Sequence, residues 1–176
     1  MPTTTNAVGP FGVAGSRLTG NGLTTLPTMK GGNATFLAYC STNQSIASVT
    51  YTKIAMDTVV LNTSGAMYDA TTNYRFTPTI AGYYLIIVQT AYNGNLATDK
   101  ISTASIYKNG TLYNVCQTTC PTNNDYNFST VTGFVYMNGS TDYVEAWTIQ
   151  TDVVSRALLG GSATYTVFSG TLIEAA

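Results

Sequence analysis

The sequence predicts an all-β fold, a sandwich or jelly roll built from about ten antiparallel strands. Short segments rich in Val, Ile, Thr, Tyr and Phe recur from residue 35 to residue 176, and turn residues separate them. Asn-Gly pairs at 109–110 and 138–139 favour tight hairpin turns, because both central positions of a type I′ turn need a positive φ. No amphipathic helical stretch of ordinary length competes with these segments.

Residues 1–34 differ from the rest of the chain. They are rich in glycine, contain Pro2, Pro10 and Pro27, and have no sustained hydrophobic period of either a strand or a helix. This composition predicts an extended N-terminal arm or linker over residues 1–34, followed by a folded head over residues 35–176.

The head is expected to contain short strands separated by turns. The predicted strands span residues 35–40, 49–54, 58–62, 74–78, 82–92, 101–109, 111–117, 126–137, 141–150 and 163–174. Within TPTIAGYYLIIVQTAYNG (77–94), Pro78 and Gly82 bracket a turn. Residues 83–88 are too few for a membrane span and too β-branched and aromatic for a helix. We therefore expect a strand buried on both faces, in a sandwich core or against another subunit.

The composition indicates association. Charged residues are 9% of the chain, compared with about 25% in a typical globular domain. Because charge is the usual device that keeps copies apart, we expect a constitutive oligomer that hides part of its surface. A formal net charge of −1 gives no electrostatic attraction to nucleic acid or to an anionic membrane, so neither is an expected partner.

The sequence gives no sign of export or membrane insertion. No basic region at the N-terminus is followed by a hydrophobic segment, so we expect no signal peptide. No apolar run approaches the length of a transmembrane helix. Synthesis in a cytoplasm is the resulting expectation.

Catalysis is not predicted. The chain has no histidine, its eight carboxylates are scattered, and it has neither a Gly-x-Ser-x-Gly elbow nor a phosphate-binding loop. GNLATDK (94–100) and PTNNDYN (121–127) could offer oxygens to calcium, but aspartates that cap turns explain them better. For the cysteines, free thiols are favoured over a local disulfide between Cys116 and Cys120, and a metal site is the weakest option.

The order of the motifs is more specific than any one of them. YDATTNYRFTPTIAGYY (68–84) is followed by ASIYKNG, by GFVYMNGSTDYVEAW and by a closing FSG (168–170). Residues 35–176 resemble the globular head of complement component C1q, within the tumour-necrosis-factor-like (TNF-like) jelly rolls. The matching positions are Tyr68, Asp69, Phe76, Gly82, Tyr84, Asn109, Gly110, Gly139, Val144, Phe168, Ser169 and Gly170. Ala81 stands in place of the proline of the family's Pro-Gly step, and no collagen-like stalk precedes the head.

This resemblance implies a ten-stranded antiparallel C1q/TNF-like jelly-roll sandwich and three subunits around a threefold axis. Alternate residues of 83–88 would face the subunit core and the trimer seam. In the final strand, Phe168 would be buried against the opposite sheet, and Gly170 would sit where a neighbouring side chain crosses closely. The candidate core or trimer-interface residues are Phe36, Tyr39, Tyr83, Tyr84, Ile86, Trp147 and Phe168.

Resemblance and composition together predict a structural virion protein of a bacteriophage, made in the host cytoplasm. It would be a homotrimeric head decoration or short fibre protein whose arm, residues 1–34, docks on other virion proteins of the capsid or fibre base. The alternative is a receptor- or glycan-binding head of a fibre or of a secreted C1q-like ligand, because tyrosine-rich loops suit recognition. No cofactor is expected; calcium is considered because some relatives bind it near their threefold axis.

Overall fold

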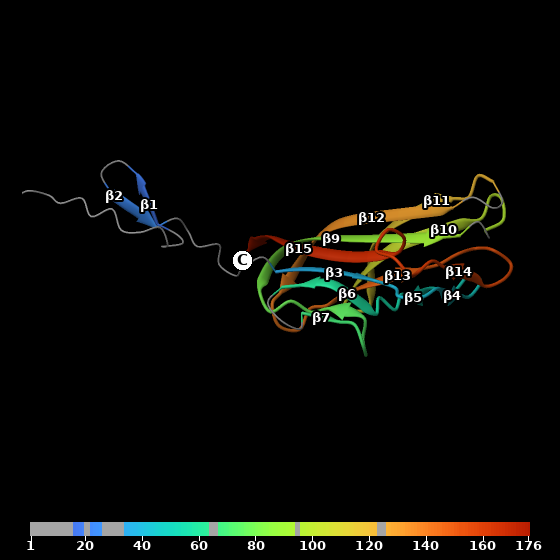
Figure 1. Ribbon diagram of the computed structural model, residues 1–176, viewed down its shortest axis with the longest axis horizontal. Helices are drawn as coiled ribbons and strands as arrows, with labels where there is room; N and C mark the ends of the chain where they lie inside the picture. The colour runs from blue at the N-terminus through green and yellow to red at the C-terminus, as the bar shows by residue number, and fades with distance from the viewer. Residues whose placement is uncertain (1–15, 20–21, 26–33, 64–66, 94–95, 123–125) are drawn as a thin grey trace, which may run out of the picture. The chain divides into compact units, whose positions relative to one another are not determined.

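The computed structural model describes residues 16–19, 22–25, 34–63, 67–93, 96–122 and 126–176, and it divides into two units, Met1–Lys30 and Gly31–Ala176 (Figure 1). In the first unit, β1 (Ser16–Thr19) pairs antiparallel with β2 (Gly22–Thr25). No strand was expected in this part of the chain. The rest of the predicted arm, apart from Ala34, lies outside the described residues.

The second unit is a sandwich of two sheets, and its described strand pairs are antiparallel. The six-stranded sheet has the order β11-β10-β13-β8-β7, and β5 also pairs with β13. Its strands are β5 (Thr52–Lys53), β7 (Tyr68–Asp69), β8 (Arg75–Phe76), β10 (Ile101–Lys108), β11 (Thr111–Thr119) and β13 (Val144–Thr148).

The seven-stranded sheet has the order β4-β14-β9-β15-β3-β6, and β12 pairs with the other side of β9. Its strands are β3 (Thr35–Tyr39), β4 (Gln44–Ile46), β6 (Thr58–Asn62), β9 (Ala81–Tyr92), β12 (Asn127–Asn138), β14 (Arg156–Leu158) and β15 (Val167–Ala175). The long strand β9 therefore lies between β12 and β15, side by side with both in Figure 1.

Aromatic rings from both sheets meet in the core around Phe36. Its ring stacks on Tyr68 and Phe76 of the six-stranded sheet, with centroids 5.0 Å and 4.4 Å away. It meets the edge of Phe168, on the neighbouring strand β15, at 4.7 Å. Phe168 also contacts Tyr68 across the sandwich at 5.8 Å, which confirms that this side chain is buried against the opposite sheet.

The all-β jelly-roll sandwich predicted from the sequence is confirmed, whereas several strand limits are corrected. The predicted strand 49–54 shrinks to β5, because Val49 takes a φ of 50° and bonds through its N–H to the carbonyl of Gln150. The last strand begins at Val167 rather than 163, because residues 162–165 form a hydrogen-bonded turn. The short strands β4, β7 and β14 were not predicted. Within the described residues, no helix is long and apolar enough to cross a membrane.

Candidate functional site

The seven-stranded sheet leaves an apolar surface on the side away from the core. Along β9, Tyr84, Ile86 and Val88 are buried in the sandwich, as the strand's alternation requires. The residues between them point outward, and Tyr83 is 51% exposed. In a single chain, therefore, β9 buries one face and presents a second face that is just as apolar.

Register places the outward side chains of neighbouring strands in rows. Leu37 of β3 pairs with Leu61 of β6 on one side and with Ser169 of β15 on the other, and Ser169 pairs with Ile87 of β9. On the far side of β9, Leu85 pairs with Phe134 of β12, which is 63% exposed. We call this surface the apolar face; it comprises Leu37, Leu61, Tyr83, Leu85, Ile87, Phe134 and Tyr136.

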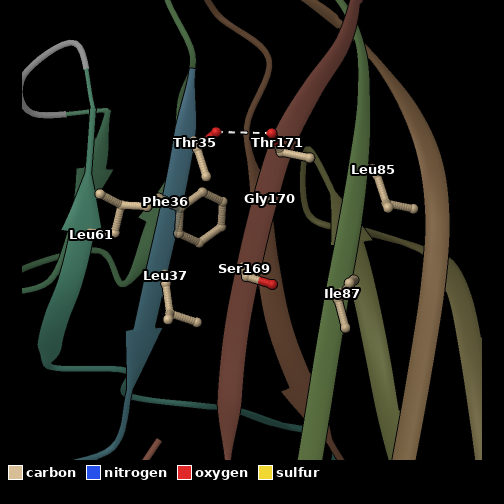
Figure 2. Close-up of a pocket in the computed structure, with 9 residues that line it drawn as sticks. All are labelled: Thr35, Phe36, Leu37, Leu61, Leu85, Ile87, Ser169, Gly170 and Thr171. Atoms are coloured by element: carbon tan, nitrogen blue, oxygen red, sulfur yellow. Dashed lines mark hydrogen bonds between the residues drawn. The ribbon is translucent and has the colours of Figure 1, made fainter. Parts of the chain in front are cut away.

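The middle of the apolar face is hollowed. A depression of about 310 Å³ is lined by Thr35, Phe36, Leu37, Leu61, Leu85, Ile87, Ser169, Gly170 and Thr171, none of them charged (Figure 2). Thr35 and Thr171 share a hydrogen bond of 2.8 Å between their hydroxyls, and the Thr35 N–H donates to the hydroxyl of Thr63. Because these threonines hydrogen-bond to one another, the surface of the depression is mainly hydrocarbon.

Gly170 brings the core close to this depression. A Cβ at this position would lie 2.6 Å from the Phe36 ring and 2.7 Å from the end of Ile86. The close crossing of a neighbouring side chain, expected from the sequence, is confirmed. Because Gly170 has no side chain, the Phe36 ring packs across β15 and itself lines the depression.

The β12 edge of the seven-stranded sheet is covered by side chains of β10 and β11 instead of by another strand. The Nζ of Lys108, the hydroxyl of Tyr113 and the Nδ2 of Asn114 donate to the carbonyls of Tyr136, Phe134 and Thr132 at 2.7, 2.7 and 2.8 Å. These acceptors are every second residue of β12, on the side that does not pair with β9. An open edge is a template for adding strands, and these caps occupy it.

Next to the closed edge, β11 carries exposed apolar side chains. Leu112, Tyr113 and Val115 are all exposed, and we call them the apolar edge. The Tyr113 hydroxyl fixes this edge to β12, whose outward residues belong to the apolar face. Two apolar surfaces of one copy, a hollow face and a strand edge, are thus held in a fixed arrangement.

The residues singled out from the sequence fall into three places. Phe36, Tyr84, Ile86 and Phe168 are buried in the sandwich core. Tyr83 belongs to the apolar face, and Tyr39, half-buried on β3, points the same way as Leu37. Trp147 is half-buried on the outward side of the six-stranded sheet, in register with Lys53. Sequence reasoning missed Phe134, although its alternation with the buried Val135 is a usable signal.

The carboxylates and thiols are held in local structure. Asp69 accepts hydrogen bonds from the N–H groups of Thr72, Thr71 and Asn73, which hold the pKa of its carboxyl well below the usual range. Burial, with a smaller effect from Asp57, raises the pKa of the Cys40 thiol to about 12. All three cysteines are free thiols. Among the described residues, no group of three or more Cys, Asp or Glu side chains is placed to hold a metal ion.

Comparison with known proteins shows the fold. No family model matches the sequence, and no curated protein matches it. The structure of mouse APRIL at pH 5.0 is similar with a TM-score of 0.59 and 16% identity, over 80% of this chain and 99% of that one. Eiger TNF from S. frugiperda is similar with a TM-score of 0.60 and 12% identity, over 82% of this chain and 94% of that one. The chain therefore has a TNF-like jelly-roll fold.

Proposed function

We propose that the chain is a structural protein of a bacteriophage virion, a homotrimer that displays its jelly-roll head as a head decoration or short fibre. The observation that supports the homotrimer is the apolar face. A head of this kind would act by shape and attachment, without catalysis or a cofactor.

Self-association follows from the chemistry of the surface. Leu61, Tyr83 and Phe134 expose 43%, 51% and 63% of their surface in the single chain, and they belong to one continuous sheet face. Large continuous apolar patches are rare on proteins that stay monomeric. Since none of the residues that line the depression is charged, a second copy with the same charge-poor composition is the partner of matching chemistry.

The two apolar surfaces favour a ring over a simple pair. The hollow apolar face and the apolar edge are different parts of one copy, so an edge packed into the face of the next copy is a head-to-tail contact. Such contacts form a closed ring when the rotation between copies allows it. Three copies is the number implied by the resemblance to C1q and TNF-like heads. The caps on β12 support packing through side chains, because they leave no open strand edge there.

The virion role rests on resemblance and composition. A compact, neutral head that follows a glycine- and proline-rich N-terminal segment suits a surface component made in the host cytoplasm and assembled onto a particle. In this proposal, residues 1–34 contact the capsid or the fibre base. Labelling the protein on purified particles and imaging them tests the role: even labelling of capsomers supports decoration, and a few copies at the tail support a fibre. Particles without label contradict the proposal.

A second candidate function is recognition of a receptor or glycan by the exposed head. The observation that favours it is a cluster of three aromatic rings, Tyr51, Tyr107 and Trp147, on the sheet opposite the apolar face. This surface would stay accessible in a trimer formed through the apolar face.

A further inference from the structure

The aromatic cluster is built on the outward side of the six-stranded sheet. Trp147 of β13 alternates with Ala146, which lies in the core, so its side chain faces away from the sandwich. Tyr107 of β10 stacks on Trp147 with ring centroids 4.8 Å apart and an interplanar angle of 26°. Tyr51, which is 42% exposed, meets Tyr107 edge to face at 6.0 Å. Three rings from three segments thus form one platform.

A charged pair borders the platform. The Lys53 ammonium donates to Oε1 of Glu145 at 3.1 Å, and the Trp147 indole N–H donates to Oε2 of the same carboxylate at 3.0 Å. Glu145 is almost fully buried, whereas a third of the Lys53 side chain is exposed. An ammonium has three N–H groups, and only one is needed for this contact. Hydrogen-bond donors therefore lie at the rim of an aromatic surface.

The platform is fixed before any ligand arrives. Register sets Trp147 opposite Lys53 and Tyr107 opposite Glu145; β10 and β13 lie in the interior of the sheet, whereas β5 pairs with β13 alone among the described strands. The bond from the indole to Glu145 sets the orientation of the Trp147 ring. A site whose side chains are held by their neighbours binds without the cost of ordering them.

We infer that Tyr51, Lys53, Tyr107 and Trp147 form a binding site for a neutral pyranose sugar, which rests on the second candidate function, glycan recognition, and does not depend on the proposed assembly. One face of a pyranose ring is lined by C–H groups that pack on aromatic rings, and its hydroxyls accept hydrogen bonds from an ammonium. A neutral sugar is preferred because the Lys53 ammonium is already paired with the Glu145 carboxylate.

The chain offers a site-specific reporter, because Trp147 is its only tryptophan. The full-length protein is titrated with the methyl glycosides of glucose, galactose and N-acetylglucosamine while the tryptophan fluorescence is recorded. We expect a saturable change with at least one of the three. The absence of a saturable change with all three overturns the inference.

Variants of Tyr51 locate the effect. Tyr51→Ala is expected to weaken binding roughly tenfold, whereas Tyr51→Phe keeps the ring and retains the affinity. Tyr126→Ala is the matched control, since Tyr126 is also exposed but stacks on Phe128 and Tyr165. Unchanged affinity in Tyr51→Ala, or an equal loss in Tyr126→Ala, overturns the assignment. Sedimentation of the same samples reports assembly separately, so failure of the sugar site and failure of the trimer are distinguished.

Discussion

The hydroxyl of Tyr113 donates a 2.7 Å hydrogen bond to the backbone carbonyl of Phe134. A side chain of β11 thereby takes the place of a paired strand along β12. Phe134 is at the same time the most exposed aromatic residue of the apolar face. The bond thus joins two functions: it closes an edge that could recruit further strands, and it fixes the position of a surface that is suited to packing on another copy.

Removing two of the caps should open this edge. In a Tyr113→Phe, Asn114→Ala double variant, the carbonyls of Phe134 and Thr132 lose their donors. We expect a loss of about 1 kcal/mol of unfolding free energy per hydrogen bond, together with β-rich aggregates during refolding. Chemical denaturation and thioflavin fluorescence measure the two effects. Tyr126→Phe is the control, and aggregation equal to that of the control contradicts the role of the caps.

A charge on the apolar face should prevent assembly. The unaltered protein is expected to sediment at about three times the 18.7 kDa chain mass at micromolar concentration. Leu85→Glu should reduce it to single chains, because Leu85 lies at the depression between Thr171 and Phe134. Val153→Glu, at an exposed position outside this face, should leave assembly unchanged. A single 18.7 kDa species for the unaltered protein would rule out the trimer.

The ring cluster in the core should dominate stability. Phe168→Ala removes a fully buried ring that contacts Phe36 and Tyr68, and should cost about 3–5 kcal/mol of unfolding free energy. Thr171→Ala, three residues further along the same strand, loses its hydrogen bond to Thr35 and should cost about 1 kcal/mol. Equilibrium denaturation compares the two. Small and equal losses would mean that β15 is peripheral, contrary to its place in the sandwich.

Acid should weaken the head partly through Asp69. Backbone N–H groups of Thr72 and Thr71 lower the pKa of this carboxyl in the folded state. A lowered folded-state pKa stabilises the fold above the unfolded pKa of about 4, and this contribution is lost as the pH falls through the folded-state value. The unfolding free energy should therefore decline below about pH 4, and less steeply in Asp69→Asn. Denaturation curves across this range test it; identical slopes in both proteins would exclude Asp69 as a cause.

Deleting residues 1–34 should separate attachment from folding. We expect the remaining head to stay β-rich and trimeric, because Ala34 is the only described core residue that the deletion removes. Attachment to the particle should be lost, since the proposal assigns it to this segment. Circular dichroism measures the β content, sedimentation measures trimer formation, and a particle-binding assay measures attachment. Loss of soluble β-rich protein would show that the head begins earlier than residue 35.

Residue composition and turn chemistry alone predicted the long strands. Residues 82–92 and 126–137 correspond closely to β9 and β12, because long runs rich in β-branched and aromatic residues between turn residues are readily recognised. Strands of two or three residues, such as β7 and β14, contain too few positions for a period and were missed. The β1–β2 hairpin was missed although Gly20-Asn21, between its strands, is a pair typical of two-residue loops.

The sequence by itself determined that this is a charge-poor, all-β chain with one strand apolar on both sides. Those properties follow from residue types and local spacing. Only the tertiary structure decided which side of β9 faces solvent, because that depends on which strands add Leu37, Leu61 and Phe134 to the same surface. Likewise, Tyr51, Tyr107 and Trp147 are far apart in sequence and become one platform only when β5 and β10 pair with β13. Pairing between distant strands is set by the packing of the whole core, which no local pattern contains.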